Sequence, residues 1–173
     1  MSVNESQARA AFEAFPVTWK RVVTEPHGFI ATLPEVGGLG EPLTFLLLCA
    51  AGNALGHLLL GWGPRGMIAI FVWQLIAAFL LAALLVLVAQ NLFEGRGGFE
   101  PTFRVVAYAW APLVVAWMPI VGVIAWLFSA YLIVRGLERV QRIDTVRAVL
   151  TLVIGTAVVW VLRAVRSGGP VWL

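Results

Sequence analysis

The chain has 173 residues, of which 61% are hydrophobic and only 12% are charged, and its formal net charge is +3. Water-soluble domains are about 45–50% apolar and about 25% charged, so the composition excludes that class and predicts one small membrane domain. The 12 Lys and Arg residues are spread over short loops, whereas a nucleic-acid site needs them clustered on one solvated face. We therefore expect no nucleic-acid partner.

Residues 1–41 are polar to amphipathic and predict an arm at the cytosolic surface of the membrane. Trp19 is followed by Lys20 and Arg21, a combination that suits a helix in the headgroup region with its cations toward anionic lipid. Three prolines are expected to break the arm into short pieces: Pro16, Pro26 and Pro34. The alternative is a loosely ordered cytosolic arm.

Five transmembrane helices are expected after the arm, since each needs about 20 apolar residues to cross roughly 30 Å of hydrocarbon. They cover about residues 43–60 and 67–92, two stretches that share the run 103–137, and residues 146–165. The sequence thus predicts an all-α polytopic membrane protein with an amphipathic interfacial N-terminal segment. The five-helix membrane domain is expected over residues 42–166, followed by a short outer tail, 167–173.

The shared run 103–137 is the ambiguous element. As one helix, about 35 residues at 1.5 Å each would exceed about 50 Å, which is too long for a single crossing. A split near Trp117–Pro119 gives two short helices joined by a hairpin. With five crossings and the N-terminus inside, nine Lys and Arg residues lie on inner segments and three on outer ones, as the positive-inside rule expects. Four crossings would export the arginine-rich loop 135–147, so five are preferred.

Glu100 and Arg104 stand four residues apart at the start of the third span, which places opposite charges on one helix face. Tyr108 and Pro112 extend that face by further steps of four. An unpaired charge near a membrane is costly, so the pair is either a structural clamp or part of a functional polar site. The preceding turn, GRGG, allows a close backbone approach but lacks the Lys-Ser/Thr of a phosphate-binding loop.

Three polar side chains are expected within the first two spans: Asn53, His57 and Gln74. Hydrogen bonds between them across the bundle would stabilise helix packing by roughly 0.6–2 kcal/mol. The alternative is a proton-linked transport path through His57. The chain has two histidines, neither with a second ligand group beside it, so we expect no metal site.

Gly52 and Gly56 form a small-residue stripe that permits close contact between helices, either within the bundle or between protomers. Cys49 lies in the same apolar run and is expected to be a small core residue. The sequence contains no nucleophile elbow, metalloprotease motif or paired carboxylates. We therefore expect neither an enzyme nor a bound cofactor.

Three pieces of sequence, GGFEPTFRVVAYAWAP, MPIVG and YLIVRGL, stand in an order and at a spacing that resembles the Yip1 domain family. The resemblance covers roughly residues 15–165. It implies five spans with a cytosolic N-terminus. The positions that it marks as family-typical are Gly98, Glu100, Arg104, Tyr108, Pro112, Pro119 and Gly122.

Eukaryotic members of this family are associated with trafficking in the endoplasmic reticulum and Golgi and with Rab GTPases. This chain lacks their long cytosolic N-terminal region, so we do not expect a Rab-type GTPase as a partner. It is more similar to the short prokaryotic members. The resemblance therefore implies an integral protein of a prokaryotic inner membrane, with its N-terminus in the cytosol and its C-terminus outside.

The sequence favours a non-enzymatic integral membrane protein that acts in membrane organisation or trafficking-type interactions. Its expected partners are membrane lipids, other membrane proteins or further copies of itself in a homo-oligomer. The alternative is a small transporter, channel or lipid-translocating protein that uses the polar region around Glu100 and Arg104. Proline-broken helices motivate this alternative, because transporters form binding sites where their helices are interrupted.

Overall fold

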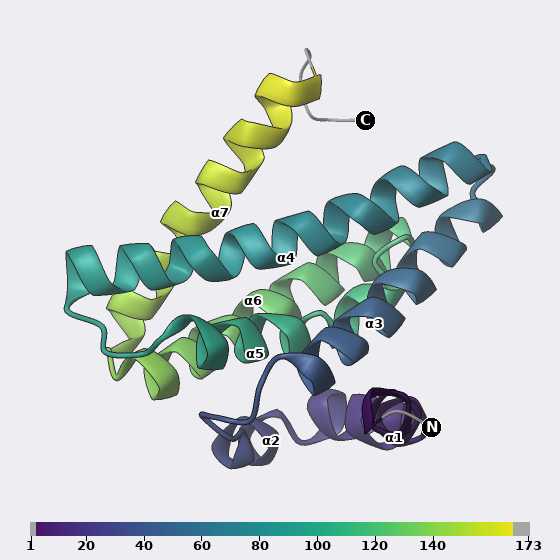
Figure 1. Cartoon of the computed structure of the whole chain (residues 1–173). Coiled ribbons are helices and arrows are strands. Elements are labelled where there is room, and N and C mark those ends of the chain that lie inside the picture. Colours follow the sequence, from purple (N-terminus) through teal and green to yellow (C-terminus); the bar gives the residue numbers. More distant parts are fainter. Residues whose placement is uncertain (1–2, 168–173) are drawn as a thin grey trace.

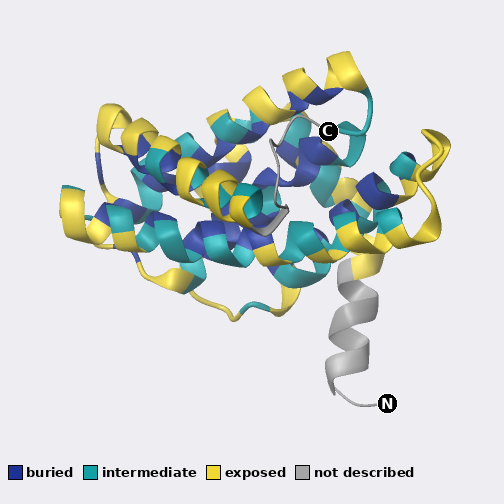
Figure 2. Ribbon diagram, turned by 90° about the horizontal axis from the view of Figure 1, so that it is seen from above, coloured by how far each residue is buried: buried dark blue, intermediate teal, exposed yellow. Residues whose placement is uncertain are grey.

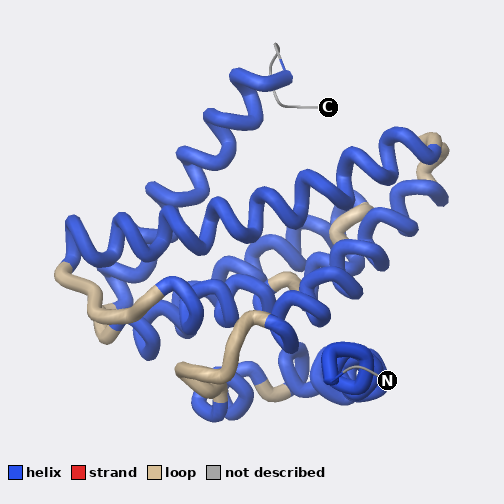
Figure 3. Tube along the Cα trace, viewed as in Figure 1, coloured by secondary structure: helices blue, strands red, loops and turns tan. Residues whose placement is uncertain are grey.

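A computed structural model describes residues 3–167 of the chain, and within this range it contains helices and loops but no strand (Figures 1 and 3). Two helices precede the bundle: α1 (Val3–Thr24) and α2 (Pro26–Thr32). The bundle consists of α3 (Gly40–Leu59), α4 (Pro64–Phe93), α5 (Phe99–Ala109), the 3₁₀-helix η1 (Ala111–Val115), α6 (Pro119–Gln141) and α7 (Thr145–Ser167). The predicted all-α class is confirmed for the described residues.

Four helices, α3, α4, α6 and α7, are long and apolar enough to cross a membrane. They match the predicted first, second, fourth and fifth spans, and α6 starts at Pro119, where the long apolar run was expected to divide. The predicted third span is not one continuous helix, because α5 ends at Ala109 and the short η1 follows. A count of five crossings is therefore not confirmed by helix length.

Pro112 explains why the third apolar segment breaks. In an α-helix its ring would clash with the carbonyl of Tyr108, and it has no N–H to donate. The chain tightens there instead: the N–H of Trp110 donates to the carbonyl of Ala107, three residues back, at 3.3 Å. Pro112 then lies in the first turn of η1, where a missing N–H is tolerated.

The bundle helices pass back and forth between two ends (Figure 1). At one end the N–H of Arg96, in the loop after α4, donates to the carbonyl of Gln141, the last residue of α6, at 3.0 Å. At the other end Gly56, near the end of α3, lies against Trp117, just before α6. Since α4 and α6 both finish at the first end, α5 and η1 return the chain to the second.

The N-terminal arm is helical and packs on the bundle. Val22 is 1% exposed, and Phe29, Ile30 and Leu33 are buried in the core that α3, α5 and α6 share. Helix α1 contacts α3 and η1, and α2 contacts α6. The arm is thus a layer of the folded chain, and the alternative of a loosely ordered arm is not supported.

Helix α1 runs through Pro16, so the break predicted there is wrong. The carbonyl that loses its helical hydrogen bond belongs to Phe12, in an exposed turn where solvent can bind it. The breaks expected at the other two arm prolines agree with the helix bounds, because Pro26 starts α2 and Pro34 lies in the linker to α3.

Many residues on the outer faces of the bundle are exposed, whereas the buried residues lie between the helices (Figure 2). The exposed faces carry many large apolar side chains, and aliphatic and aromatic residues fill the interior. Large exposed hydrophobic side chains include Ile68, Val72 and Leu87 on α4, Ile120, Val123 and Leu127 on α6, and Val149, Val153 and Val161 on α7. A water-soluble monomer rarely exposes an apolar surface of this extent, and a lipid environment accounts for it. The fold is that of a multi-pass membrane protein.

Candidate functional site

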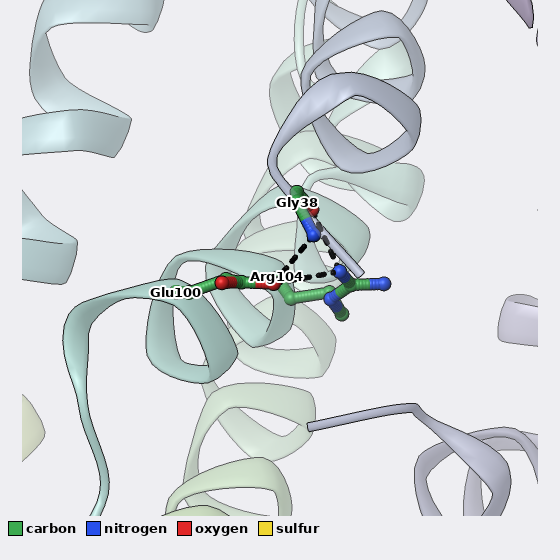
Figure 4. A network of polar contacts seen from close by, with 3 residues as sticks. All are labelled: Gly38, Glu100 and Arg104. Carbon is green, nitrogen blue, oxygen red and sulfur yellow. Dashed lines mark hydrogen bonds and ion pairs between the residues drawn. The ribbon is translucent and has the colours of Figure 1, made fainter. Parts of the chain in front are cut away.

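The Arg104 clamp (Gly38, Glu100 and Arg104) joins α5 to the linker between α2 and α3 (Figure 4). The Arg104 side chain is 2% exposed, and its Nη2 donates to the carbonyl of Gly38 at 2.7 Å and to Glu100 Oε1 at 3.3 Å. The N–H of Gly38 donates to the same carboxylate oxygen at 2.6 Å. The charged pair predicted from its spacing is therefore formed, and it closes on a main-chain partner 66 residues away.

The linker glycines allow this close approach. A Cβ on Gly37 would lie 3.2 Å from Arg104 Nη2, and the φ angle of Gly37 is +136°, a backbone conformation that residues with a Cβ rarely adopt. Arg104 Nε is buried and has no hydrogen-bond partner among the described residues. The guanidinium is thus packed beneath the linker and bound from one side.

Tyr108 continues the same face of α5 toward the arm. Its ring lies 5.0 Å from the ring of Phe29 in an edge-on contact at 73°, and 4.9 Å from the ring of Phe45. These contacts connect α2, α3 and α5. The predicted stripe of Glu100, Arg104 and Tyr108 therefore contacts the linker and the arm, with Glu100 at its more exposed end.

The glycine-rich turn packs on the end of α6 through Gln141, which the sequence interpretation missed. Gln141 is 0% exposed; its Oε1 accepts from the N–H of Gly97 at 2.9 Å, and its Nε2 donates to Thr102 Oγ1 at 2.9 Å. An amide at the end of an apolar span was the available signal, because such a group needs a partner. The sequence gave no indication of which group would bind the Gln141 amide.

Gly97 and Gly98 have different roles in this turn. A Cβ on Gly97 would lie 2.5 Å from the carbonyl oxygen of Val140, so only glycine fits without a shift. At Gly98, the residue before α5, the nearest atom to an added Cβ would be 4.0 Å away. The close approach predicted for this turn is thus required at Gly97 and not at the family-typical Gly98.

The hairpin before α6 contains two further positions that the sequence resemblance marks, Pro119 and Gly122. Pro119 starts α6, and the N–H of Gly122 donates to the carbonyl of Met118 at 2.6 Å. A Cβ on Gly122 would lie 2.5 Å from the carbonyl oxygen of Ala116. Gly122 therefore lets the first turn of α6 fold back on the end of η1.

Gly52 and Gly56 make their close contact within the chain. A Cβ on Gly56 would overlap the indole ring of Trp117, and one on Gly52 would lie 3.1 Å from Val114 Cγ1. Both neighbours belong to the segment between α5 and α6, residues 110–118, which we call the broken segment. The sequence left open whether these glycines contact another part of the same bundle or a second protomer. In the structure their close contact is within the bundle.

Asn53 and Gln74 bind each other next to the helix break. Asn53 Nδ2 donates to the carbonyl of Leu113 at 2.7 Å, and Gln74 Nε2 donates to Asn53 Oδ1 at 3.1 Å. Trp19 Nε1 donates to the carbonyl of Ala111 at 2.8 Å. Two carbonyls of the broken segment are thus bound by side chains from distant helices, as an irregular backbone in a membrane protein requires.

A cavity of about 290 Å³ lies beside this network, between α3, α4, α6, α7 and the broken segment. All three predicted intramembrane polar residues line it: Asn53, His57 and Gln74. Five of the chain's eight tryptophans also line it: Trp62, Trp73, Trp110, Trp126 and Trp160. The sequence interpretation missed this aromatic wall, because its members come from five separate segments of the chain.

A comparison with protein families matches residues 20–164 to the Yip1 domain. This match covers most of the chain. The chain belongs to the Yip1 domain family. Comparisons with curated proteins and with solved structures gave no significant match.

The positions that the sequence resemblance marks lie mainly in two regions of the fold. Glu100, Arg104 and Tyr108 lie on the face of α5 that contacts the linker and the arm, whereas Pro112, Pro119 and Gly122 shape the broken segment before α6. Among the described residues, no three His, Cys, Asp or Glu side chains of this Yip1 domain lie close enough to hold a metal ion.

Proposed function

We propose that this Yip1-family member is a non-enzymatic membrane protein that acts in membrane organisation or trafficking-type interactions, through lipid or protein partners. One observation carries the proposal. The charged residues of the family motif make their hydrogen bonds inside the fold, with Arg104 only 2% exposed, while the apolar faces of α4, α6 and α7 stay open. Contact with partners in the membrane plane is the activity that these faces support best.

The proposal includes five membrane crossings, with α5 and η1 together as the third. Two observations support it: α4 and α6 finish at the same end of the bundle, and that end carries Arg96, Arg139, Arg142 and Arg147. A cationic end is expected in the cytosol. The N-terminus is then cytosolic, the C-terminus lies outside, and the membrane is a prokaryotic inner membrane.

Photo-cross-linking in intact membranes tests the proposed function. A benzophenone side chain is placed in turn at Ile68, Ile120 and Val153, which are exposed on α4, α6 and α7. At least one face should give a discrete protein adduct or a specific lipid adduct, and an unirradiated sample should give none. Diffuse, equal labelling from all three faces would contradict a specific partner surface.

A small transporter, channel or lipid-translocating protein is the second candidate. The specific observation in its favour is the cavity beside a proline-broken segment, with Gln74 and His57 in its wall. The Arg104 clamp supports it less, since its polar groups bind one another and the linker. Liposomes containing wild type or Glu100→Ala should show the ion flux and lipid scrambling of empty liposomes. Flux that wild type produces and Glu100→Ala loses would favour transport.

A further inference from the structure

Two residues that line the aromatic cavity each carry a buried hydrogen-bonding atom that has no partner among the described residues. These atoms are Nδ1 of His57 and Nε1 of Trp110, whose side chain is 4% exposed. A buried indole N–H that binds nothing is costly, and it can only donate a hydrogen bond. Any group that binds Trp110 Nε1 must therefore be an acceptor.

Arg163 gives the same cavity a positive charge. Its guanidinium carbon lies 5.7 Å from the ring centre of Trp73 and 5.6 Å from that of Trp160. No acidic residue lines the cavity, and no carboxylate in the described part of the chain forms an ion pair with Arg163. A guanidinium stacked on rings keeps its N–H donors available to an anion.

The rest of the wall is apolar. Ile70 and Leu81 of α4, Leu113 of η1 and Val159 of α7 line the cavity beside the tryptophans. Its volume, about 290 Å³, is near the lower end of the range of about 300–1,000 Å³ for small-molecule pockets. It can hold the charged end of one molecule and a short apolar stretch, and a longer chain would continue along the exposed residues of α4 and α7.

The divergence of two helices opens this site. Gly155 of α7 lies close to Leu85 and Leu81 of α4, where an added Cβ would lie 3.2 Å from Leu85 Cδ2. Toward its C-terminal end α7 leaves the side of α4 (Figure 1). Arg163 of α7 still contacts the ring of Trp73 of α4, and both residues line the cavity. The cavity therefore lies between two faces that are apolar on the outside, where a lipid chain can approach.

We propose that this cavity binds one anionic lipid. A phosphate or carboxylate oxygen accepts a hydrogen bond from Trp110 Nε1 and pairs with Arg163, and an acyl chain lies between α4 and α7. This inference rests on the proposed function in one respect, because it names lipid as a partner. No bond is made or broken in the site.

Native mass spectrometry of the full chain released from nanodiscs tests the proposal. Wild type should retain one phosphatidylglycerol from anionic nanodiscs and no phosphatidylcholine from neutral ones. Arg163→Gln and Trp110→Phe should each reduce this retention about tenfold, as the loss of a hydrogen bond to a charged group does. The matched control is Arg65→Gln, which removes an exposed arginine at the start of α4 and should retain lipid as wild type does.

Equal retention by wild type and Arg163→Gln would overturn the proposal, as would an equal loss in Arg65→Gln. Inorganic phosphate added to lipid-free protein in detergent should give no stable adduct; an adduct as stable as that of the lipid would overturn the choice of a lipid. If Trp110→Phe fails to fold, Arg163→Gln still decides, because its half-buried side chain lies at the cavity edge. The two experiments can fail separately. If no lipid is retained, cross-links from the faces of α4, α6 and α7 can still support the proposed function. If cross-linking finds no partner, lipid retention in the cavity is unaffected.

Discussion

Arg104 is a buried charge whose partners differ in exposure. Its carboxylate partner, Glu100, is 36% exposed, whereas the Gly38 carbonyl belongs to the linker that covers the guanidinium. Removing Glu100 leaves the buried Arg104 cation without an opposite charge. Removing Arg104 leaves the Glu100 carboxylate, which water can solvate. The two substitutions are therefore expected to have unequal effects.

Glu100→Ala should lower stability by about 2 kcal/mol, which is the cost of unpairing a buried charge discounted for the exposure of Glu100. Arg104→Met should cost less, and the double variant should be no less stable than Glu100→Ala alone. Asp144→Asn is the control, since it removes an exposed ion pair with Arg147 and should cost under about 1 kcal/mol. Thermal unfolding in one lipid composition measures all four. Equal losses for Glu100→Ala and Asp144→Asn would mean that the clamp is no stronger than a surface pair.

Of the glycines of α3, Gly56 is the one that the broken segment approaches most closely. Gly56→Ala would drive a methyl group into the ring of Trp117 and should destabilise the bundle by about 1–3 kcal/mol. Gly63→Ala is the matched control, because nothing lies within 4 Å of a Cβ at Gly63. Melting temperature and particle size are measured together. A change of oligomer size at unchanged stability would instead place this contact between protomers.

At the scale of elements, the arm and the broken segment stabilise each other. The chain leaves the α-helical path around Pro112, and α1 supplies an indole N–H that binds the carbonyl of Ala111 in this segment. The sequence interpretation placed Trp19 among lipid headgroups because it stands beside Lys20 and Arg21. A tryptophan beside charged residues is typical of a site where an apolar region meets a polar one. The sequence pattern does not show whether the apolar region is lipid or another part of the protein.

Trp19→Phe should detach the arm in part, because it keeps an aromatic ring but removes the donor to the Ala111 carbonyl. We expect a loss of about 0.5–1.5 kcal/mol in stability. Amide hydrogen exchange over residues 17–33 should become faster. Val17→Ala, which changes an exposed residue of the same helix, is the control and should leave the exchange rate unchanged. Equal exchange in both variants would show that the hydrogen bond does not hold the arm.

At the scale of the whole molecule, the direction of each helix matters more than its length. Three elements separate the α3–α4 loop from the α6–α7 loop: α4, α5 with η1, and α6. If α5 with η1 crosses, the two loops lie on opposite sides of the membrane, and if it does not, they lie on the same side. Cys49 is 0% exposed, so an introduced cysteine can report on each loop alone.

Gly63→Cys and Asp144→Cys should therefore label differently with a membrane-impermeant maleimide. In intact cells Gly63→Cys should react and Asp144→Cys should not, whereas both should react after permeabilisation. Wild type, with its buried Cys49, serves as the background control. Labelling of both loops in intact cells, or of neither, would contradict five crossings.

The sequence by itself determined what depends on short segments. Hydropathy and length gave the membrane class and four of the spans, Pro119 marked the division of the long apolar run, and the four-residue spacing paired Glu100 with Arg104. These features are local, because a helix fixes the geometry between residues three or four apart. The pieces of sequence that resemble the Yip1 domain family are equally short, so the resemblance was recognisable before any fold was known.

The tertiary structure alone decided which distant groups meet. Arg104 binds a linker carbonyl, Gln141 binds the glycine-rich turn, and Asn53 binds the carbonyl of Leu113, 60 residues later, in the irregular segment after α5. The cavity is likewise assembled from separate helices, with Trp110 and Arg163 brought into one wall. Each contact depends on how the helices pack and on the breaks between them, and a pattern along one helix carries no information about its neighbour.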